Sequence, residues 1–162
     1  MEHLWAPWRM EYILDHRKGK KCIFCPIKGQ SDEKRLIVYR TPLSVVMLNR
    51  YPYAYAHLMV APVRHIDEVS KLKPEEMTDI FQNLGQAINI LKEAFHPKGF
   101  NVGMNLGQVG GAGIPHHLHL HIVPRWRGDM NFMPAIAEVR VIPEHLNRTC
   151  EKLSRYFNKL ED

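Results

Sequence analysis

The sequence predicts an α+β domain, in which an antiparallel sheet carries helices on one face. The expected elements follow the order strands, helix, strands, helix, without the regular strand–helix alternation of a parallel α/β fold. Two strand-like runs are separated only by Thr41-Pro42, which is typical of a hairpin. The chain has 162 residues, 45% of them hydrophobic, so we expect a single domain over 1–162 with one core.

Five runs of residues predict the strands of this sheet. LIVYR (36–40) and LSVVMLN (43–49) are rich in β-branched residues and form the hairpin. HLMVAPV (57–63) is a third strand that ends near a proline. FNVGMNL (100–106) and HLHLHIV (117–123) complete a five-stranded antiparallel sheet.

Two helices pack against this sheet in the prediction. Pro74 begins a long central helix over 74–95, because proline is favoured in the first helical turn, and Pro97 with Gly99 ends it. Its apolar residues recur at steps of three and four: Met77, Ile80, Phe81, Leu84, Ile88, Leu91 and Phe95. A C-terminal extension carries an amphipathic helix over about 143–160, and a short helix is expected over 8–16.

Charge narrows the expected partners only in part. Lys and Arg number 22 against 17 Asp and Glu, a net charge of +5, which favours an acidic partner. The one dense basic run, 17–21, is followed by no nucleic-acid-binding signature, so we expect no nucleic acid. No apolar run approaches the length of a membrane helix and no signal peptide opens the chain, so we expect a cytoplasmic protein without a membrane partner.

The three cysteines do not predict a disulfide framework, because three thiols cannot all pair. Cys150 lies on a predicted helix among apolar residues and is expected to be a buried thiol. Cys22 and Cys25 form a C-x-x-C motif, which is a redox pair, half of a metal site or an accident of sequence. A loop rather than a helix follows the motif, so the metal interpretation is favoured if two further ligands exist.

Histidines cluster on the last predicted strand. His117, His119 and His121 alternate with apolar residues, so a strand places the three imidazoles on one face, about 6.6 Å apart at each step. Two chemistries fit this row. The imidazoles bind a metal, or one attacks phosphorus as a nucleophile while its second nitrogen stays protonated and neighbouring donors neutralise the phosphate oxygens.

A glycine-rich loop, GQVGGAG (107–113), leads into the histidines. Glycine lets the backbone approach a ligand closely, and successive N–H groups can form an anion nest. In a basic protein this combination favours phosphate chemistry at the histidines. Arg125, directly after the strand, is a candidate for additional positive charge.

These residues resemble the histidine triad (HIT) family, whose signature His-φ-His-φ-His-φ-φ, with φ apolar, is matched at every position of 117–123. Other segments lie in the family's order and approximate spacing, within a resemblance that covers about 20–126: 22–27, 48–49, 56–62 and 105–107. The flanking segments LWAPWRMEY (4–12) and PRWRGDMNFMP (124–134) look like the branch of the family that acts on diadenosine tetraphosphate (Ap4A).

The resemblance implies a role for each matching residue. His119 would be the nucleophile that attacks the α-phosphorus, with His121 and His57 beside the phosphate and His117 orienting the strand or binding a metal. Asn49 would contact the ribose. The phosphate would meet Asn105 and the loop residues Gly107, Gln108, Gly111 and Gly113. The base pocket would be lined by four residues for which plain core packing is an equal alternative: Ile23, Phe24, Ile27 and Met47.

The resemblance also implies a metal and a second copy of the chain. Family members that carry zinc use two cysteines, a histidine after the third strand and the first histidine of the triad, which here are Cys22, Cys25, His65 and His117. Such a closed Cys₂His₂ site would be structural and would leave His119 free. The alternatives are two buried thiols with His65 exposed, or His116 as a substitute ligand. No organic cofactor is implied, and a homodimer is.

The sequence departs from the common family pattern before the histidines. Many members carry Gln-Ser or Gln-Thr there, whereas this chain has Ala112-Gly113-Ile114-Pro115, and one extra residue separates Asn105 from His117. Some phosphorylase-type members have a serine near Gly113, and its absence leaves the second-step acceptor open.

The function that these residues favour is nucleotidyl transfer. We expect cleavage of Ap4A-like dinucleoside polyphosphates at the α-phosphate through a nucleotidyl-histidine, with phosphorolysis to ADP and ATP preferred. The alternatives are hydrolysis of Ap4A, hydrolysis of nucleoside phosphoramidates or adenylates, a slow nucleotide-binding module, and a zinc-dependent hydrolase that uses the three triad histidines as ligands.

Overall fold

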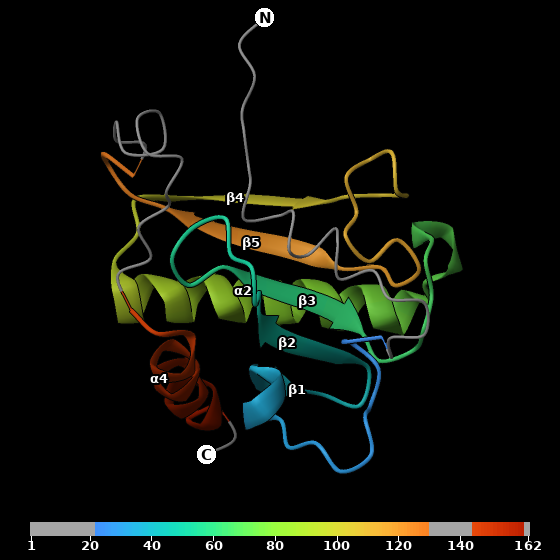
Figure 1. The fold of residues 1–162 in the computed structure, drawn as a ribbon, viewed down its shortest axis with the longest axis horizontal. Coiled ribbons are helices and arrows are strands. Elements are labelled where there is room, and N and C mark those ends of the chain that lie inside the picture. Colours follow the sequence, from blue (N-terminus) through green and yellow to red (C-terminus); the bar gives the residue numbers. More distant parts are fainter. Residues whose placement is uncertain (1–21, 130–143, 161–162) are drawn as a thin grey trace, which may run out of the picture.

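A computed structural model describes residues 22–129 and 144–160; the helix expected over 8–16 and the basic run 17–21 lie outside these ranges. Five strands form one antiparallel sheet in the order β1-β2-β3-β5-β4 (Figure 1). Their bounds are β1 Ile37–Arg40, β2 Ser44–Leu48, β3 Leu58–Pro62, β4 Gly99–Met104 and β5 Leu120–Arg125. The predicted five-stranded antiparallel sheet is therefore confirmed.

The helices lie where the sequence places them. The long helix α2 spans Pro74–Phe95 and packs along β2, β3 and β5, while α4 spans Leu146–Asn158 and packs on β1 and α2 (Figure 1). Two short 3-10 turns are η1 (Glu33–Arg35), which precedes β1, and η2 (Val69–Lys71), which precedes α2. The α+β class is confirmed, because the helices cover one face of the sheet.

Glu76 organises the start of α2. Its Oε2 accepts the backbone N–H of Lys73 at 2.9 Å, and the Arg64 guanidinium donates to both of its carboxylate oxygens at 2.9 and 2.7 Å. These bonds hold the pKa of Glu76 down at about 2, since they favour the charged carboxylate. The helix ends at Phe95, and the next residue, His96, has a left-handed φ of 51°. The pair also ties the loop after β3, which contains Arg64, to the start of α2.

The apolar pattern of α2 was only partly assigned correctly from the sequence. Phe81 is 61% exposed and Met77 is exposed as well, although both fit the helical period. These two residues lie one turn apart, so a single outer flank carries them both. The other predicted residues face inward: Ile80 and Leu91 are buried, and Leu84, Ile88 and Phe95 are partly buried against the core. The buried stripe also contains residues that the apolar pattern did not include: Glu76, Asn83, Ala87, Ile90 and Ala94.

Each face of the sheet has its own apolar cluster, because successive strand residues point to opposite faces. On the helix face, Val46, Leu48, Leu58 and Val60 join β5 and the helices in the larger core. On the other face, a smaller cluster contains Phe24, Ile37, Val45, Met47, Met59 and Ala61. The segment after Cys22 covers this second face, which is the face that carries the histidines.

The last strand begins later than predicted. Regular pairing in β5 runs over Leu120–Arg125 rather than 117–123. Leu118 precedes it and donates its N–H to the Ile66 carbonyl at 2.6 Å. Pro124 lies within the strand, where β5 pairs with β4 up to Arg125 but no longer with β3, so the edge toward β3 needs no donor at this position.

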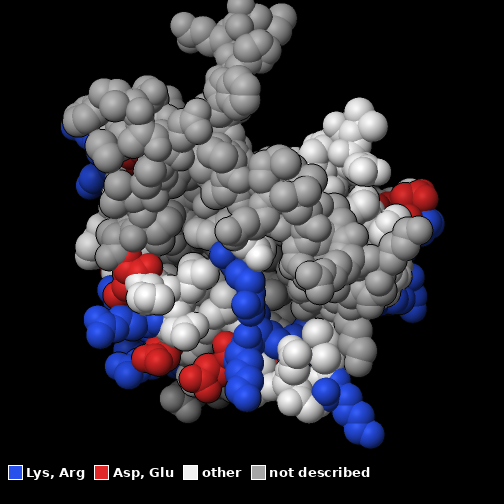
Figure 2. All heavy atoms as spheres, viewed as in Figure 1, with Lys and Arg blue, Asp and Glu red and all other residues white. Residues whose placement is uncertain are grey.

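The surface of the described residues mixes both signs of charge. Figure 2 shows basic side chains over the end of the molecule where η1 and β1 lie in Figure 1, with acidic side chains beside them. The net charge alone therefore points to no extended binding surface on this face.

Among the described helices, none combines the length and the apolar character that a membrane crossing requires.

Candidate functional site

The ring of His119 is held in one orientation and one tautomer. Its Nδ1 lies 2.8 Å from the carbonyl oxygen of His117, and because that oxygen can only accept, Nδ1 carries the proton. The lone pair is then on Nε2. The side chain is 5% exposed, and burial lowers its pKa against the opposing effect of the carbonyl hydrogen bond. The arrangement is that of a neutral imidazole with one nitrogen available as a nucleophile.

A second pair of histidines lies beside it. The backbone N–H of Tyr53 donates to Nδ1 of His57 at 3.1 Å, so the proton of a neutral His57 is on Nε2. That Nε2 lies 2.9 Å from Nδ1 of His121. His121 then carries its own proton on Nε2, where it can donate to an anionic group. His57 itself is fully buried, so it reaches a ligand only through His121.

A cavity opens beside the rings of His119 and His121. Of the residues predicted to bind substrate or to catalyse, eight line it: Ile23, Ile27, Met47, Asn49, Asn105, Gly113, His119 and His121. Six others do not line it: Phe24, His57, Gly107, Gln108, Gly111 and His117. Apolar side chains thus form one wall and the histidines another, as a nucleoside phosphate would need.

The charge of this cavity is one-sided. Lys34, Arg35 and Arg50 contribute to its lining, and no carboxylate does among the described residues. Arg125, a candidate for this role from the sequence, instead bonds Asp129 at 2.6 Å and Asn101 at 2.9 Å. The cavity is therefore receptive to an anion through residues that the sequence did not single out.

The two predicted asparagines are held by their own loops. Asn49 accepts the N–H of Tyr51 at 2.9 Å through Oδ1, and its Nδ2 lies 3.5 Å from Nδ1 of His57. Asn105 donates through Nδ2 to the Gly111 carbonyl at 3.3 Å. Gly107 and Gly111 have positive φ values of 71° and 86°, which explains the glycines at these turns.

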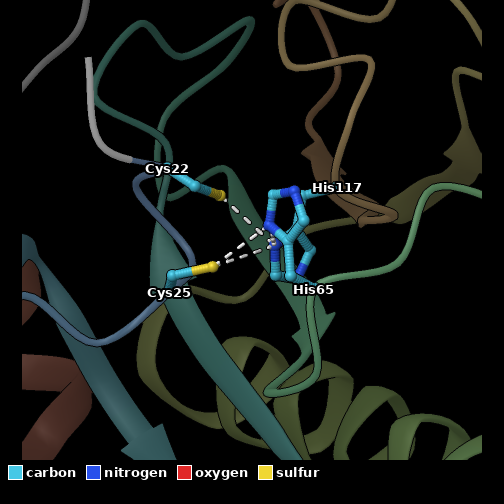
Figure 3. A group of neighbouring side chains, drawn as sticks. All are labelled: Cys22, Cys25, His65 and His117. Atoms are coloured by element: carbon cyan, nitrogen blue, oxygen red, sulfur yellow. Dashed lines mark hydrogen bonds between the residues drawn. The ribbon is translucent and has the colours of Figure 1, made fainter. Parts of the chain in front are cut away.

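A second group of four side chains, which includes His117, lies close together in the structure. Figure 3 shows the sulfurs of Cys22 and Cys25 and the rings of His65 and His117 pointing toward one another. Nδ1 of His117 lies 3.2 Å from Cys22 Sγ, 3.6 Å from Cys25 Sγ and 3.1 Å from His65 Nδ1. The four ligand atoms lie within 4.8 Å of one another, so this group could hold a metal ion. His116 is exposed and lies outside the group.

The donor set fits a tetrahedral metal. Bonds of about 2.0–2.3 Å place neighbouring ligand atoms roughly 3.3–3.8 Å apart, close to the spacings within the group. His117 donates through Nε2 to the Pro62 carbonyl at 2.8 Å, which leaves Nδ1 as the ligand atom. Burial and the neighbouring Cys22 raise the pKa of Cys25 to about 11, whereas a metal would bind the thiolate. Such a raised pKa does not favour the redox interpretation of the motif.

Sequence reasoning missed three contributions to the site. Arg35 is buried next to the cavity, although in the sequence it resembles any basic residue before a strand. The backbone of Tyr53 sets the His57 tautomer, and only the aromatic run 51–55 drew attention to that loop. Phe24 packs its ring on His119 rather than on the cavity, at 4.9 Å between centroids.

Fold and site together define an α+β protein in which a histidine cluster faces an anion-receptive cavity beside a four-residue metal group. The chain belongs to the HIT family: residues 30–128 match the family model described as the HIT domain. A relative from Mycobacterium tuberculosis, named AP-4-A phosphorylase, is 38% identical over 157 residues, which cover 92% of this chain and 80% of the relative.

More distant relatives share the fold or part of the chain. The bis(5'-nucleosyl)-tetraphosphatase [asymmetrical] of Schizosaccharomyces pombe is 32% identical, over 59% of this chain and 52% of its own length. A zinc-bound histidine triad family protein from Mycobacterium smegmatis superposes with a TM-score of 0.63 at 23% identity, over 78% and 86% of the two chains. A Plasmodium falciparum diadenosine triphosphate hydrolase gives 0.63 at 19% identity, over 94% and 93%.

Proposed function

We propose that this protein is a nucleotidyltransferase that cleaves dinucleoside polyphosphates of the Ap4A kind at the α-phosphorus. The observation that carries the proposal is the orientation of His119, whose Nδ1 is occupied by the His117 carbonyl while its ring lines the cavity. The name of the relative at 38% identity, AP-4-A phosphorylase, supports the choice of substrate.

The first step transfers a nucleotidyl group to the protein. The Nε2 lone pair of His119 attacks the α-phosphorus, an N–P bond forms, and the P–O bond to the leaving nucleotide breaks. With Ap4A the leaving group is ATP and the histidine carries AMP. His121, which donates through Nε2, neutralises charge on the phosphate, and the N–H of His119 stays on the His117 carbonyl.

The second step releases the nucleotide to an acceptor. Attack by inorganic phosphate gives ADP and frees His119, whereas attack by water gives AMP. We favour phosphate because of the Mycobacterium tuberculosis relative, while the name of the Schizosaccharomyces pombe relative points to hydrolysis. The stretch 112–115 carries no serine that would mark the acceptor.

The lining of the cavity supports a role in substrate binding for part of the predicted contacts. Ile23, Ile27 and Met47 offer an apolar wall to a base, and Asn49 and Asn105 lie where a ribose and a phosphate would enter. The remaining proposed phosphate contacts come from the glycine loop: Gly113 lines the cavity, whereas Gly107, Gln108 and Gly111 would have to meet the phosphate beyond the lining. The described residues that line the cavity include no carboxylate, which favours a polyanion over a neutral nucleoside.

Incubation of the protein with Ap4A, with and without inorganic phosphate, tests the proposal. ADP plus ATP, formed only with phosphate and resolved by chromatography, supports phosphorolysis; AMP plus ATP in both samples supports hydrolysis. His119→Ala is expected to abolish turnover while the folded state survives. Near wild-type turnover by that variant would overturn the mechanism.

The alternative functions use the same cavity and histidines but differ in substrate or in mechanism. A hydrolase of nucleoside phosphoramidates or adenylates would prefer an AMP-amidate to Ap4A in a substrate panel, and a slow binding module would show single turnovers only. A zinc hydrolase on His117, His119 and His121 is not favoured, because His117 turns its free nitrogen to the cysteines. Trapping of a labelled nucleotide on His119 would exclude it.

We further propose that the metal is zinc and that its role is structural. Cys22, Cys25, His65 and His117 would fill all four positions of a tetrahedral ion, which leaves none for substrate. The ion would fasten the N-terminal segment to the sheet. The zinc-bound Mycobacterium smegmatis structure shows that another protein of this fold is found with zinc.

A homodimer remains a proposal. Exposed Phe81 and Met77 on α2, and exposed Val102 on the edge strand β4, offer apolar area for a second copy. Sedimentation would measure the mass of the particle in solution. A monomer at micromolar concentration would contradict the proposal.

A further inference from the structure

One residue of the Cys22–Cys25 loop connects the metal group to the nucleophile. Phe24 lies between the two cysteines and is 3% exposed. Its ring stacks on the His119 ring with 4.9 Å between centroids and 28° between planes, and it lies tilted against His117 at 5.1 Å. The same short loop thus presents two sulfurs to the metal group and one aromatic face to the nucleophilic imidazole.

Arg35 holds this loop through its backbone. Its Nη2 donates two hydrogen bonds of 2.8 Å, one to the carbonyl of Ile23 and one to the carbonyl of Cys25. These carbonyls flank Phe24 on both sides along the backbone. The guanidinium therefore holds the peptide unit directly before Phe24 and the one after Cys25, and so restrains the short segment that carries the Phe24 ring.

The burial of Arg35 is unusual enough to require an explanation. The residue is 7% exposed, and among the described residues no carboxylate forms an ion pair with it. Its Nε is buried without a hydrogen-bond partner in the described part of the chain. A buried charge with unmet hydrogen-bonding capacity opposes folding, and an apolar side chain would fill the space without this cost. Keeping an arginine here therefore points to a role for its two carbonyl contacts.

The effect on His119 follows from the stacking. A flat ring packed on the imidazole limits its rotation about χ2, which preserves the bond from Nδ1 to the His117 carbonyl and keeps Nε2 toward the cavity. It also keeps water away from that face of the ring. Neither Phe24 nor the metal group needs to touch the phosphate to influence the reaction.

We propose that Arg35 and a metal ion on Cys22 and Cys25 are two anchors of one loop, which together hold Phe24 on the imidazole of His119. Arg35 and Phe24 are then positioning residues for the chemistry, and metal loading is coupled to the orientation of the nucleophile. The kinetic part of this inference rests on the proposed nucleotidyl transfer, whereas the coupling of metal and ring does not.

The experiment compares Arg35→Met, Arg35→Lys and Phe24→Leu with the zinc-loaded wild type. A surface variant of the same residue type, Arg40→Met, serves as the control, since Arg40 forms an exposed pair with Asp32. Three quantities are measured: the rate of zinc transfer to a chromophoric chelator, the tautomer of the His119 ring by ¹⁵N NMR, and kcat and KM for Ap4A. Circular dichroism checks the fold of each variant.

For Arg35→Met we expect faster zinc release, a mixture of His119 tautomers and a kcat lowered by up to about 10²-fold with KM nearly unchanged. Arg35→Lys restores part of each effect, because an ammonium can reach a carbonyl. Phe24→Leu lowers kcat and mixes the tautomers, but it leaves zinc release close to wild type. The control Arg40→Met changes none of the three quantities.

Unchanged zinc release and a single His119 tautomer in both Arg35 variants would overturn the proposal. A rise in KM alone would assign Arg35 to substrate binding instead. If Arg35→Met does not fold, Arg35→Lys and Phe24→Leu still decide the matter. If the wild type does not turn over Ap4A, the proposed function fails, while zinc release and NMR still test the coupling without substrate.

Discussion

Nε2 of the fully buried His57 lies 2.9 Å from Nδ1 of His121. The other ring nitrogen of His57, Nδ1, accepts a hydrogen bond from the backbone N–H of Tyr53. These two hydrogen bonds form a relay from the Tyr53 backbone through His57 to His121. Because the Tyr53 N–H can only donate, the donor and the acceptor of each bond in a neutral relay are fixed. His57 therefore sets the tautomer of His121 rather than meeting the substrate. This relationship could not be derived from the spacing of the two histidines in the sequence.

Replacing His57 tests the relay. His57→Phe keeps the ring volume but removes the donor to His121 Nδ1, so His121 loses the constraint that holds its proton on Nε2. We expect kcat for Ap4A to fall by at least about 10-fold, since a misplaced proton weakens acid–base and phosphate contacts. Steady-state kinetics measure the change. An unaltered kcat in a folded variant would show that His121 does not need His57.

Removal of the metal tests the four-residue group. We expect about one zinc ion per chain by elemental analysis, falling toward zero in Cys22→Ser or after chelation, together with a lower midpoint of thermal unfolding. Cys150→Ala is the matched control, because Cys150 is buried in α4 on the other side of the sheet. Full zinc content in Cys22→Ser would contradict the assignment.

The pH dependence of the free energy of unfolding tests the interaction between Glu76 and Arg64 at the start of α2. The pKa of Glu76 is lowered to about 2, chiefly by the hydrogen bonds from Arg64, whereas an unfolded glutamate titrates near 4.3. A depressed folded-state pKa stabilises the fold above the unfolded pKa and loses this contribution as the pH falls toward 2. Glu76→Gln should therefore cost about 1–2 kcal/mol of unfolding free energy at pH 7 and much less near pH 2. Urea titrations at both pH values measure this difference; a constant gap would refute it.

Replacing glycine by alanine is expected to have different effects at Gly110, in the loop before the histidines, and at Gly85, on α2. A Cβ on Gly110 would lie 2.2 Å from the Leu106 carbonyl oxygen, so Gly110→Ala must shift the loop that Asn105 bonds. We expect KM for Ap4A to rise by roughly 10-fold, as a loop contact to phosphate is lost.

Gly85 on α2 has open space around it, and Gly85→Ala should stabilise the protein by about 0.5–1 kcal/mol with unchanged kinetics. Equal KM values for both variants would remove the loop from the substrate site.

Much of the fold followed from local patterns. The limits of α2 were predicted correctly, because Pro74 and Pro97 act on the backbone directly, whatever surrounds them. The exposed position of Phe81 was not predicted, since periodicity shows which residues share a flank and not which flank meets the sheet. The start of β5 at Leu120 depends likewise on where β3 and β4 offer partners.

For the candidate site, the sequence by itself determined the row of histidines, since alternation along an extended chain puts His117, His119 and His121 on one side. It also indicated the metal group through the family resemblance, which joins Cys22 and Cys25 to His65 and His117. Only the tertiary structure decided the direction of each ring: His117 toward the sulfurs, His119 toward the cavity and His57 onto His121. It also placed Arg35 under the Cys22–Cys25 loop. The reason is that a ring nitrogen takes its role from the group that packing brings within hydrogen-bond distance. Some of these groups, such as Cys22 for His117 and His121 for His57, lie far away along the chain.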